Sequence, residues 1–202
     1  MIFHLCLFAS ELPGPPMICL NSNFRPNQSD AVLTAGSAFS LSCHGNGSVY
    51  WSSSAFRLKF EDRLPNPVQV SRADPRHTGT YCCRYTNHSL EHMHTWIHLY
   101  ITGETSLGHA PCHSSPTLKE GQDYLFKCLL TDPSLTNLTL QSKDRGRGLP
   151  PGMKVTFDPR KGALIQQLQR SFNGQYTCSG WKDGRLNATF PVSLGTHCRK
   201  PS

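Results

Sequence analysis

The feature that most constrains this chain is a short motif, Gly-x-Tyr-x-Cys, that occurs twice. The first copy is Gly79-Thr-Tyr-Cys-Cys83, and the second is Gly174-Gln-Tyr-Thr-Cys178. Each copy follows a further cysteine at a distance that suits a small β domain, Cys43 before the first and Cys128 before the second. A motif repeated in this way predicts two structural units of the same kind.

This turn-and-strand pattern is typical of immunoglobulin-type sandwiches. In that fold the tyrosine hydroxyl binds backbone at a corner, and the cysteine two residues later bridges the two sheets. We therefore predict the disulfides Cys43–Cys83 and Cys128–Cys178, with Trp51 packed on the first bridge. Cys82 alternates with Cys83 along the strand, so it should face outward. No stretch has a convincing helical period, which predicts an all-β chain of two tandem immunoglobulin-like β-sandwich domains.

The length of 202 residues suits two domains of about 100 residues each. Turn-rich sequence between the two motifs marks the division. The predicted segments are a signal-like or irregular lead-in at 1–23, a first domain at 24–103, a linker at 104–116, a second domain at 117–195 and a tail at 196–202.

Two independent features indicate the secretory pathway. The chain has nine cysteines, a number expected for an oxidising compartment. It also has five Asn-x-Ser/Thr sequons, which are candidate N-glycosylation sites, at Asn27, Asn46, Asn87, Asn137 and Asn187. No run of apolar residues is long enough to span a membrane. We expect an extracellular protein, at the cell surface as part of a longer receptor or secreted if the chain is complete.

The cysteines outside the two frames leave their pairing open. Cys6 is expected to leave with a signal sequence, and the remaining four allow three pairings that the sequence does not rank. These four are Cys19, Cys82, Cys112 and Cys198. Cys82 and Cys112 are also candidate reactive thiols, but no adjacent base supports that hypothesis.

The sequence gives little support for catalysis. The best metal candidates are the histidines near the first motif, His88, His92, His94 and His98. His92 and His94 share one face of a predicted strand, but no cysteine or aspartate completes a ligand set. We therefore predict no metal, no cofactor and no enzymatic activity, and keep a secreted metal-dependent enzyme as the least favoured alternative.

A basic loop in the second domain is the strongest candidate for partner binding. It contains Lys143, Arg145 and Arg147, and Lys154 follows nearby. Residues 117–195 contain 11 Lys/Arg and 6 Asp/Glu, a net charge of +5, against +2 for residues 21–103. A solvated loop, an anionic polymer such as heparin, and an acidic protein ligand are all compatible with these charges. Nucleic acid is disfavoured, because no aromatic residues interleave with the charges.

The motifs resemble those of class III receptor tyrosine kinases, in particular the macrophage colony-stimulating factor receptor group. Segments 42–51, 77–83 and 96–100 are similar to the first immunoglobulin domain of that group. The second domain is represented by Cys128-Leu-Leu-Thr-Asp-Pro133, the Arg145-Gly-Arg147 loop and Phe157-Asp-Pro-Arg-Lys-Gly162. The resemblance covers about residues 17–195, although the linker lacks the Asp-Pro-x-x-Pro-Trp run expected there.

The resemblance implies a function for the basic loop. The family binds dimeric helical cytokines, here macrophage colony-stimulating factor and interleukin-34, through its second and third immunoglobulin domains. It thus implies ligand contacts by Arg145 and Arg147 and, by position, by Lys143 and Lys154. The chain has none of the family's membrane-proximal domains, membrane span or kinase, so the resemblance implies a cytokine-binding fragment or soluble form. An adhesion, heparin-binding or platelet-derived growth factor receptor-like immunoglobulin protein is the alternative.

Overall fold

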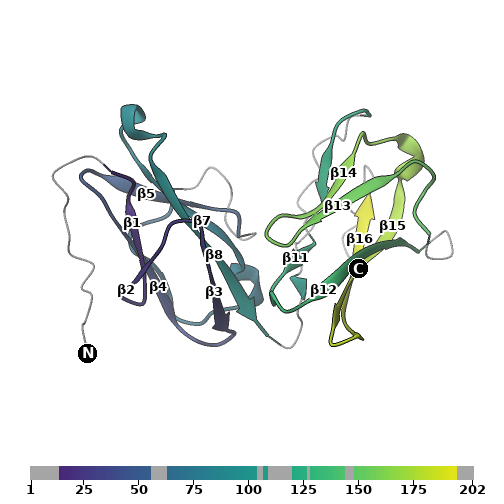
Figure 1. Ribbon diagram of the computed structural model, residues 1–202, viewed down its shortest axis with the longest axis horizontal. Coiled ribbons are helices and arrows are strands. Elements are labelled where there is room, and N and C mark those ends of the chain that lie inside the picture. Colours follow the sequence, from purple (N-terminus) through teal and green to yellow (C-terminus); the bar gives the residue numbers. More distant parts are fainter. Residues whose placement is uncertain are drawn as a thin grey trace, which may run out of the picture. The chain divides into compact units, whose positions relative to one another are not determined.

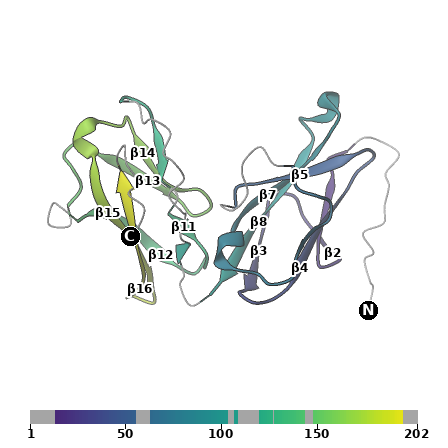
Figure 2. The same cartoon turned by 180° about the vertical axis from the view of Figure 1, so that it is seen from behind.

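The computed structural model of the chain describes residues 14–55, 63–103, 107–108, 120–126, 128–143 and 148–194. The chain divides into two compact units, Met1–Gly103 (unit 1) and Glu104–Ser202 (unit 2). Each unit is built almost wholly from β-strands arranged as facing sheets (Figures 1 and 2). The predicted all-β, immunoglobulin-like architecture is therefore confirmed.

Unit 1 contains two four-stranded sheets. The first has the order β2-β1-β4-β6, and the second has the order β3-β8-β7-β5. All strand pairs are antiparallel except β3 with β8, which is parallel. The strands are β1 (Met17–Leu20), β2 (Asn23–Arg25), β3 (Ser29–Thr34), β4 (Phe39–His44), β5 (Val49–Ser53), β6 (Val68–Val70), β7 (Gly79–Tyr85) and β8 (His94–Thr102).

The start of unit 1 differs from the expected irregular lead-in. Met17–Leu20 forms β1, pairs with β4, and buries Ile18, Cys19 and Leu20. The segment before it is held as well, because the Tyr85 hydroxyl donates to the Gly14 carbonyl at 2.8 Å and Thr95 Oγ1 donates to the Pro16 carbonyl. The prolines before β1 favour a loop in the sequence. The three consecutive apolar side chains that follow them instead form a buried strand.

The core of unit 1 surrounds the predicted bridge. Cys43 on β4 is joined to Cys83 on β7, and Trp51 beside them is fully buried. The indole N–H of Trp51 donates to Asn66 Oδ1 at 3.1 Å. Asn66 also accepts from the Cys43 N–H and donates to the Cys43 carbonyl, at 2.9 and 2.8 Å. One amide side chain thus satisfies both the indole and an edge of β4, which removes the cost of burying unpaired polar groups.

Unit 2 contains two three-stranded sheets and a short two-stranded ladder, in the orders β10-β14-β13, β12-β15-β16 and β11-β9. All of its strand pairs are antiparallel. The strands are β9 (Leu107–Gly108), β10 (Tyr124–Phe126), β11 (Leu129–Leu130), β12 (Thr136–Ser142), β13 (Lys154–Asp158), β14 (Gly162–Gln166), β15 (Gly174–Lys182) and β16 (Arg185–Leu194). The second predicted bridge is present, between Cys128 and Cys178 on β15.

Both units close with the tyrosine corner that the repeated motif predicts. A short 3-10 turn precedes each corner, η1 (Pro75–His77) in unit 1 and η3 (Arg170–Phe172) in unit 2. The Tyr81 hydroxyl donates to the His77 carbonyl at 2.8 Å, and the Tyr176 hydroxyl donates to the Phe172 carbonyl. Burial raises the pKa of Tyr81 well above its ordinary range, opposed in part by a hydrogen bond with Ser53. The phenol therefore stays a neutral donor.

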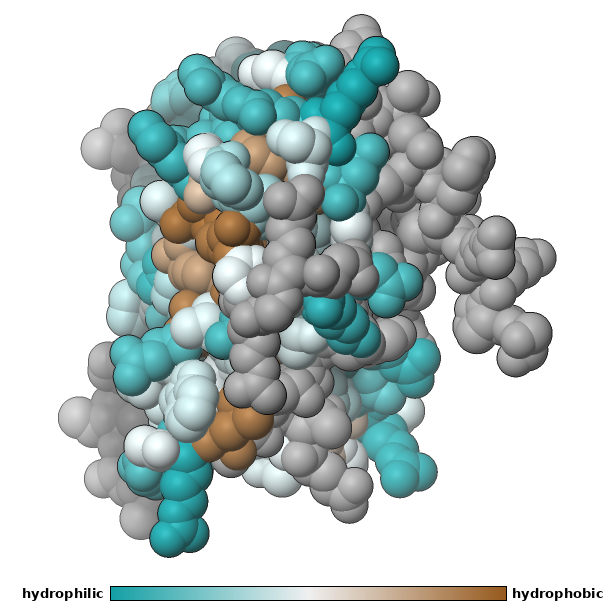
Figure 3. Space-filling view, turned by 90° about the vertical axis from the view of Figure 1, so that its right-hand side faces the viewer, coloured by the Kyte–Doolittle hydropathy of each residue, from teal (hydrophilic) through white to brown (hydrophobic). Residues whose placement is uncertain are grey.

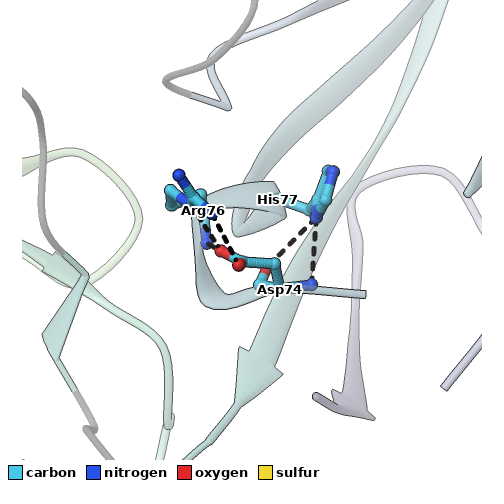
Figure 4. Close-up of polar contacts among 3 residues, drawn as sticks. All are labelled: Asp74, Arg76 and His77. Atoms are coloured by element: carbon cyan, nitrogen blue, oxygen red, sulfur yellow. Dashed lines mark hydrogen bonds and ion pairs between the residues drawn. The ribbon is translucent and has the colours of Figure 1, made fainter. Parts of the chain in front are cut away.

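The corner of unit 1 carries an additional cap. Asp74 accepts from the Arg76 N–H and, with both carboxylate oxygens, from the Arg76 guanidinium (Figure 4). The Asp74 backbone N–H in turn donates to His77 Nδ1 at 3.0 Å, and this second hydrogen bond completes a capping box. Such a box satisfies amide groups at the start of a turn that would otherwise lack partners. In unit 2 the N-cap residue of η3, Gln169, makes no side-chain cap hydrogen bond.

Candidate ligand-binding site

The candidate site lies at the end of unit 2 where the tyrosine corner closes the sandwich. Lys143 directly follows β12, and its N–H donates to the Gln175 carbonyl at 2.8 Å, just beyond η3. Lys154 begins β13 and pairs with Gln166, the last residue of β14, a few residues before η3. The fold thus brings two basic residues that are 11 positions apart to one end of the unit. We call this end, defined by Lys143, Lys154, Gln166 and η3, the corner end of unit 2.

The corner end of unit 2 presents more free positive than negative charge. Lys143 and Lys154 are exposed, and within the described ranges neither forms an ion pair. Arg170 is also at this end; its side chain is 89% exposed and lies 3.5 Å from Glu120 Oε2. The nearby carboxylate of Asp123 accepts a hydrogen bond from the Gln167 N–H at 3.0 Å. Exposed cations gathered in this way raise the encounter rate with an acidic partner.

The two arginines that the family resemblance implicates, Arg145 and Arg147, lie outside the described residues. Their segment, 144–147, directly follows Lys143. Their role remains a prediction, whereas Lys143 and Lys154 are placed together at the corner end. Sequence reasoning missed Arg170, which is distant from the basic loop along the chain. Its position just before the second Gly-x-Tyr-x-Cys motif could have predicted its place, because in this fold the segment before that motif lies at the same end of the unit as the end of β12.

Apolar side chains form a band on one face of the described surface. Figure 3 shows this band flanked by hydrophilic side chains. The large apolar side chains that unit 2 exposes, among those described, are Leu125, Leu149 and Leu186. Each is about half exposed or less, a degree common on the surfaces of soluble proteins.

The Thr-Asp-Pro element of the second domain has a structural role. Asp132 Oδ1 accepts from the N–H and the hydroxyl of Ser134, at 2.9 and 2.6 Å, and Asp132 Oδ2 accepts from Lys182 Nζ at 3.0 Å. Burial would raise the pKa of the Asp132 carboxyl, but the hydrogen bonds from Ser134 and the Lys182 charge outweigh it and lower the pKa. The element therefore fixes the loop after β11 to the end of β15.

The histidines do not form a metal site among the residues that the structure describes. No group of three or more His, Cys, Asp and Glu with metal-binding spacing occurs there. His98 is fully buried, with Nδ1 2.8 Å from Thr80 Oγ1 and its ring centroid 4.6 Å from that of Tyr100. His88 faces Glu91 at 3.6 Å on an exposed turn.

The structure describes two of the extra cysteines, Cys82 and Cys19. Cys82 is the free cysteine among those described, and it alternates outward from buried Cys83 as predicted. Burial raises the pKa of the Cys82 thiol, and Arg84 opposes this only in part, so the reactive thiolate is disfavoured. Cys19 on β1 is itself disulfide-bonded. Cys112 and Cys198 lie outside the described residues.

Four of the five sequon asparagines have described side chains, and all four are exposed: Asn27, Asn46, Asn87 and Asn137. Asn87 Oδ1 accepts from the N–H and the hydroxyl of Ser89, the third residue of its own sequon, at 3.0 and 2.9 Å. Asn187 lies on β16, and its side chain is outside the description. The exposed asparagines are accessible to modification.

Comparison with known proteins identifies the class. A scan against protein-family models gives no match. The chain resembles the N-terminal eight immunoglobulin domains of Down syndrome cell adhesion molecule, with a TM-score of 0.56, 14% identity, and coverage of 90% of this chain and 24% of that one. At this identity the likeness establishes the fold alone. This is a tandem immunoglobulin-domain protein, and within the described residues no helix is long and apolar enough to cross a membrane.

Sequence similarity identifies the branch of that class. The chain is 60% identical over 205 aligned residues to macrophage colony-stimulating factor 1 receptor 2 of Takifugu rubripes, covering 98% of this chain and 20% of that protein. It is 33% identical to receptor 1 of the same fish, covering 92% and 20%, and 28% identical to the mast/stem cell growth factor receptor Kit of Canis lupus familiaris, covering 87% and 17%. The chain is homologous to the N-terminal immunoglobulin-domain region of these receptors.

The chain spans about one fifth of the length of these curated relatives. The part of the relatives that it matches is extracellular immunoglobulin-domain sequence and not the kinase domain. The similarity therefore supports a receptor ectodomain, as the sequence motifs predicted.

Proposed function

We propose that the chain is the cytokine-binding part of a cell-surface receptor, and that it binds an acidic helical cytokine through the corner end of unit 2. The observation that carries this proposal is the convergence of exposed Lys143 and Lys154 on the end from which the Arg145–Arg147 segment starts. The first relative reported above is a macrophage colony-stimulating factor receptor, which makes that cytokine the first ligand to test, with interleukin-34 as the second.

The chemistry of the site suits such a ligand. Arginine forks pair with carboxylates in a fixed two-point geometry, and lysines add mobile positive charge around them. The resulting surface would attract an acidic face over a distance of about one Debye length, about 8 Å at physiological salt. Binding would therefore weaken as salt is added.

The test is charge reversal at the loop. Arg145→Glu with Arg147→Glu is expected to weaken binding of macrophage colony-stimulating factor at least about tenfold. The dissociation constant would be measured by calorimetry at fixed salt, on the full chain and on the chain extended by the family's third immunoglobulin domain. The matched control is Lys161→Glu with Arg185→Glu, which makes the same charge change on residues that lie away from the corner end.

The control is expected to change the affinity by less than about fivefold, because isolated exposed charges contribute about 1 kcal/mol or less. An unchanged dissociation constant for the Arg145 and Arg147 variant would refute the proposal. Retention on a heparin column without cytokine binding would instead support the alternative of a polyanion-binding immunoglobulin protein.

A further inference from the structure

The five sequons, three in unit 1 and two in unit 2, all lie at one end of their unit. In unit 1 they lie near the β4–β5 and β7–β8 turns. Asn46 is in the first turn and Asn87 in the second, and the Thr86 N–H in the second donates to the Ser48 carbonyl in the first at 2.9 Å. Asn27 lies at the same end, because its Oδ1 accepts a hydrogen bond from the N–H of Trp96, near the start of β8, at 3.1 Å. We call this end the loop end of unit 1.

In unit 2 the two sequons also share one end, on β12 and β16, the two strands that pair with β15. Thr136 pairs with Trp181 and Thr139 with Ser179, so Asn137 lies in an irregularity opposite Gly180. On the other side of β15, Gly180 pairs with Ala188 and Trp181 with Leu186, which places Asn187 in an irregularity at the same level. This level is close to the β15–β16 turn and to the Asp132–Lys182 ion pair. We call it the loop end of unit 2.

The tyrosine-corner ends lack sequons in both units. In unit 1 the corner end is formed by η1 with Ala35 and Gly36, which bind Thr102 and Ala73 through backbone hydrogen bonds of 2.7 Å. In unit 2 it is formed by Lys143, Lys154, Gln166 and η3, as defined above. Every sequon therefore lies at the end of its unit that is remote from the corner.

We propose that N-linked glycans shield the loop end of each unit, which leaves the corner ends bare, and that the corner end of unit 2 is the docking surface for an acidic protein. The choice of docking partner rests on the proposed function. Each glycan forms a bond between the asparagine amide nitrogen and C1 of a sugar, and releases the amide proton and the lipid pyrophosphate that carried the sugar. A glycan is bulky and strongly hydrated, so its position decides which surfaces a protein can approach.

The chain offers a sharp test of this partition. Lys154→Asn creates a sequon with Val155 and Thr156 at the corner end, and Ser134→Asn creates one with Leu135 and Thr136 at the loop end. Both positions are exposed. Each full-length variant would be expressed through a secretory pathway, and the fraction whose mass carries the extra glycan would be tested against macrophage colony-stimulating factor.

The added glycan at Lys154→Asn is expected to weaken binding at least about tenfold, or about 1.4 kcal/mol. The glycan at Ser134→Asn is expected to leave it unchanged. Lys154→Gln, and Lys154→Asn combined with Thr156→Ala, remove the same charge without adding a glycan, and both are expected to weaken binding by less than about fivefold. Equal binding by the two glycosylated variants, or loss with Ser134→Asn, would overturn the assignment of the docking surface.

A second measurement tests the shield without any ligand. Glycopeptide mapping of the unaltered protein should find glycans at Asn27, Asn46, Asn87, Asn137 and Asn187. Acetylation of lysines before and after enzymatic glycan removal should show increased reactivity at Lys182, at the loop end, and no change at Lys143 and Lys154. Empty sequons, or equal gains at all three lysines, would overturn the shield even if the cytokine binds. Absence of cytokine binding with this labelling pattern intact would refute the proposed function alone.

Discussion

The two tyrosine corners use the same motif for different physical reasons. At Gly79 a side chain would meet backbone, since a Cβ atom there would lie 2.6 Å from the Ala55 N and 2.8 Å from the Ala55 Cα. At Gly174 the backbone itself requires glycine, because φ is +155°. Unit 1 thus needs glycine for space, and unit 2 needs it for a dihedral angle. Identical residues in a repeated motif need not satisfy the same constraint.

The largest expected effect comes from filling these two positions. Gly79→Ala should destabilise unit 1 by about 1–3 kcal/mol through overpacking against the backbone of Ser54 and Ala55, just after β5. Gly174→Ala should destabilise unit 2 by a similar or smaller amount, about 1–3 kcal/mol, through dihedral strain. Urea unfolding of the full chain, with hydrogen exchange to assign the loss to a unit, would measure both.

The control for this pair is Gly47→Ala. A Cβ atom at Gly47 would meet the Tyr85 ring at 3.8 Å, an ordinary contact, so the cost should stay within about 0.5 kcal/mol. If Gly79→Ala cost no more than Gly47→Ala, the steric explanation for the unit 1 corner would fail.

The second largest effect is expected from removing the N-cap side chains of the two 3-10 turns, η1 and η3. Asp74→Ala removes acceptors for the Arg76 N–H and guanidinium, and should lower the stability of unit 1 by about 1 kcal/mol. Gln169→Ala removes no cap, so unit 2 should change by less than about 0.5 kcal/mol. Asp74→Asn keeps a cap acceptor but weakens the exposed ion pair, and thermal melts of the three variants would separate the two contributions. Equal losses at Asp74 and Gln169 would contradict the comparison.

The smallest expected effect is a pH dependence located in unit 2. Asp132 has a lowered pKa in the folded chain, so its contribution to stability is present above the ordinary carboxyl pKa, near 4, and is lost as the pH falls through the folded value. Acidification should therefore lower the melting temperature of unit 2, and Asp132→Asn should remove part of that slope. Melts between about pH 7 and pH 3 would test this. An identical slope in the variant would assign the acid sensitivity elsewhere.

The sequence allowed prediction of what is local and periodic. The pairing of Cys43 with Cys83 follows from strand alternation, because only the residue two after Tyr81 shares its inward face. Phe39, Leu41 and Cys43 are buried in the alternation expected of β4. The tyrosine hydroxyl bonds follow from the same motif in both units. In these cases the residue type and its spacing fix the contact.

Contacts that depend on distant segments were not predictable. His98 and Tyr100 alternate with the core residues Ile97, Leu99 and Ile101 along β8, a pattern typical of outward-facing residues, yet both are buried, at 0% and 3% exposure. The Asn66 clamp on Cys43 and Trp51 joins a loop to two strands, and no local pattern announces it. The corner end of unit 2 is equally non-local, because Lys143, Lys154 and Arg170 come to the same end of the unit only through the pairing of β12 with β15 and of β13 with β14.

The Asn66 clamp also makes unit 1 optically distinct. Trp51 is fully buried and its indole is hydrogen-bonded, while Trp96 and Trp181 are only partly covered. A disulfide quenches the fluorescence of a neighbouring indole, and Trp51 is the cross-strand partner of Cys83, so its emission is expected to be weak in the folded unit and to rise when unit 1 unfolds. The longer-wavelength emission combines Trp96 of unit 1 with Trp181 of unit 2. Unfolding of unit 1 can therefore be followed through Trp51 without an added dye, and a Trp96→Phe variant would leave Trp181 as the partly covered indole of unit 2.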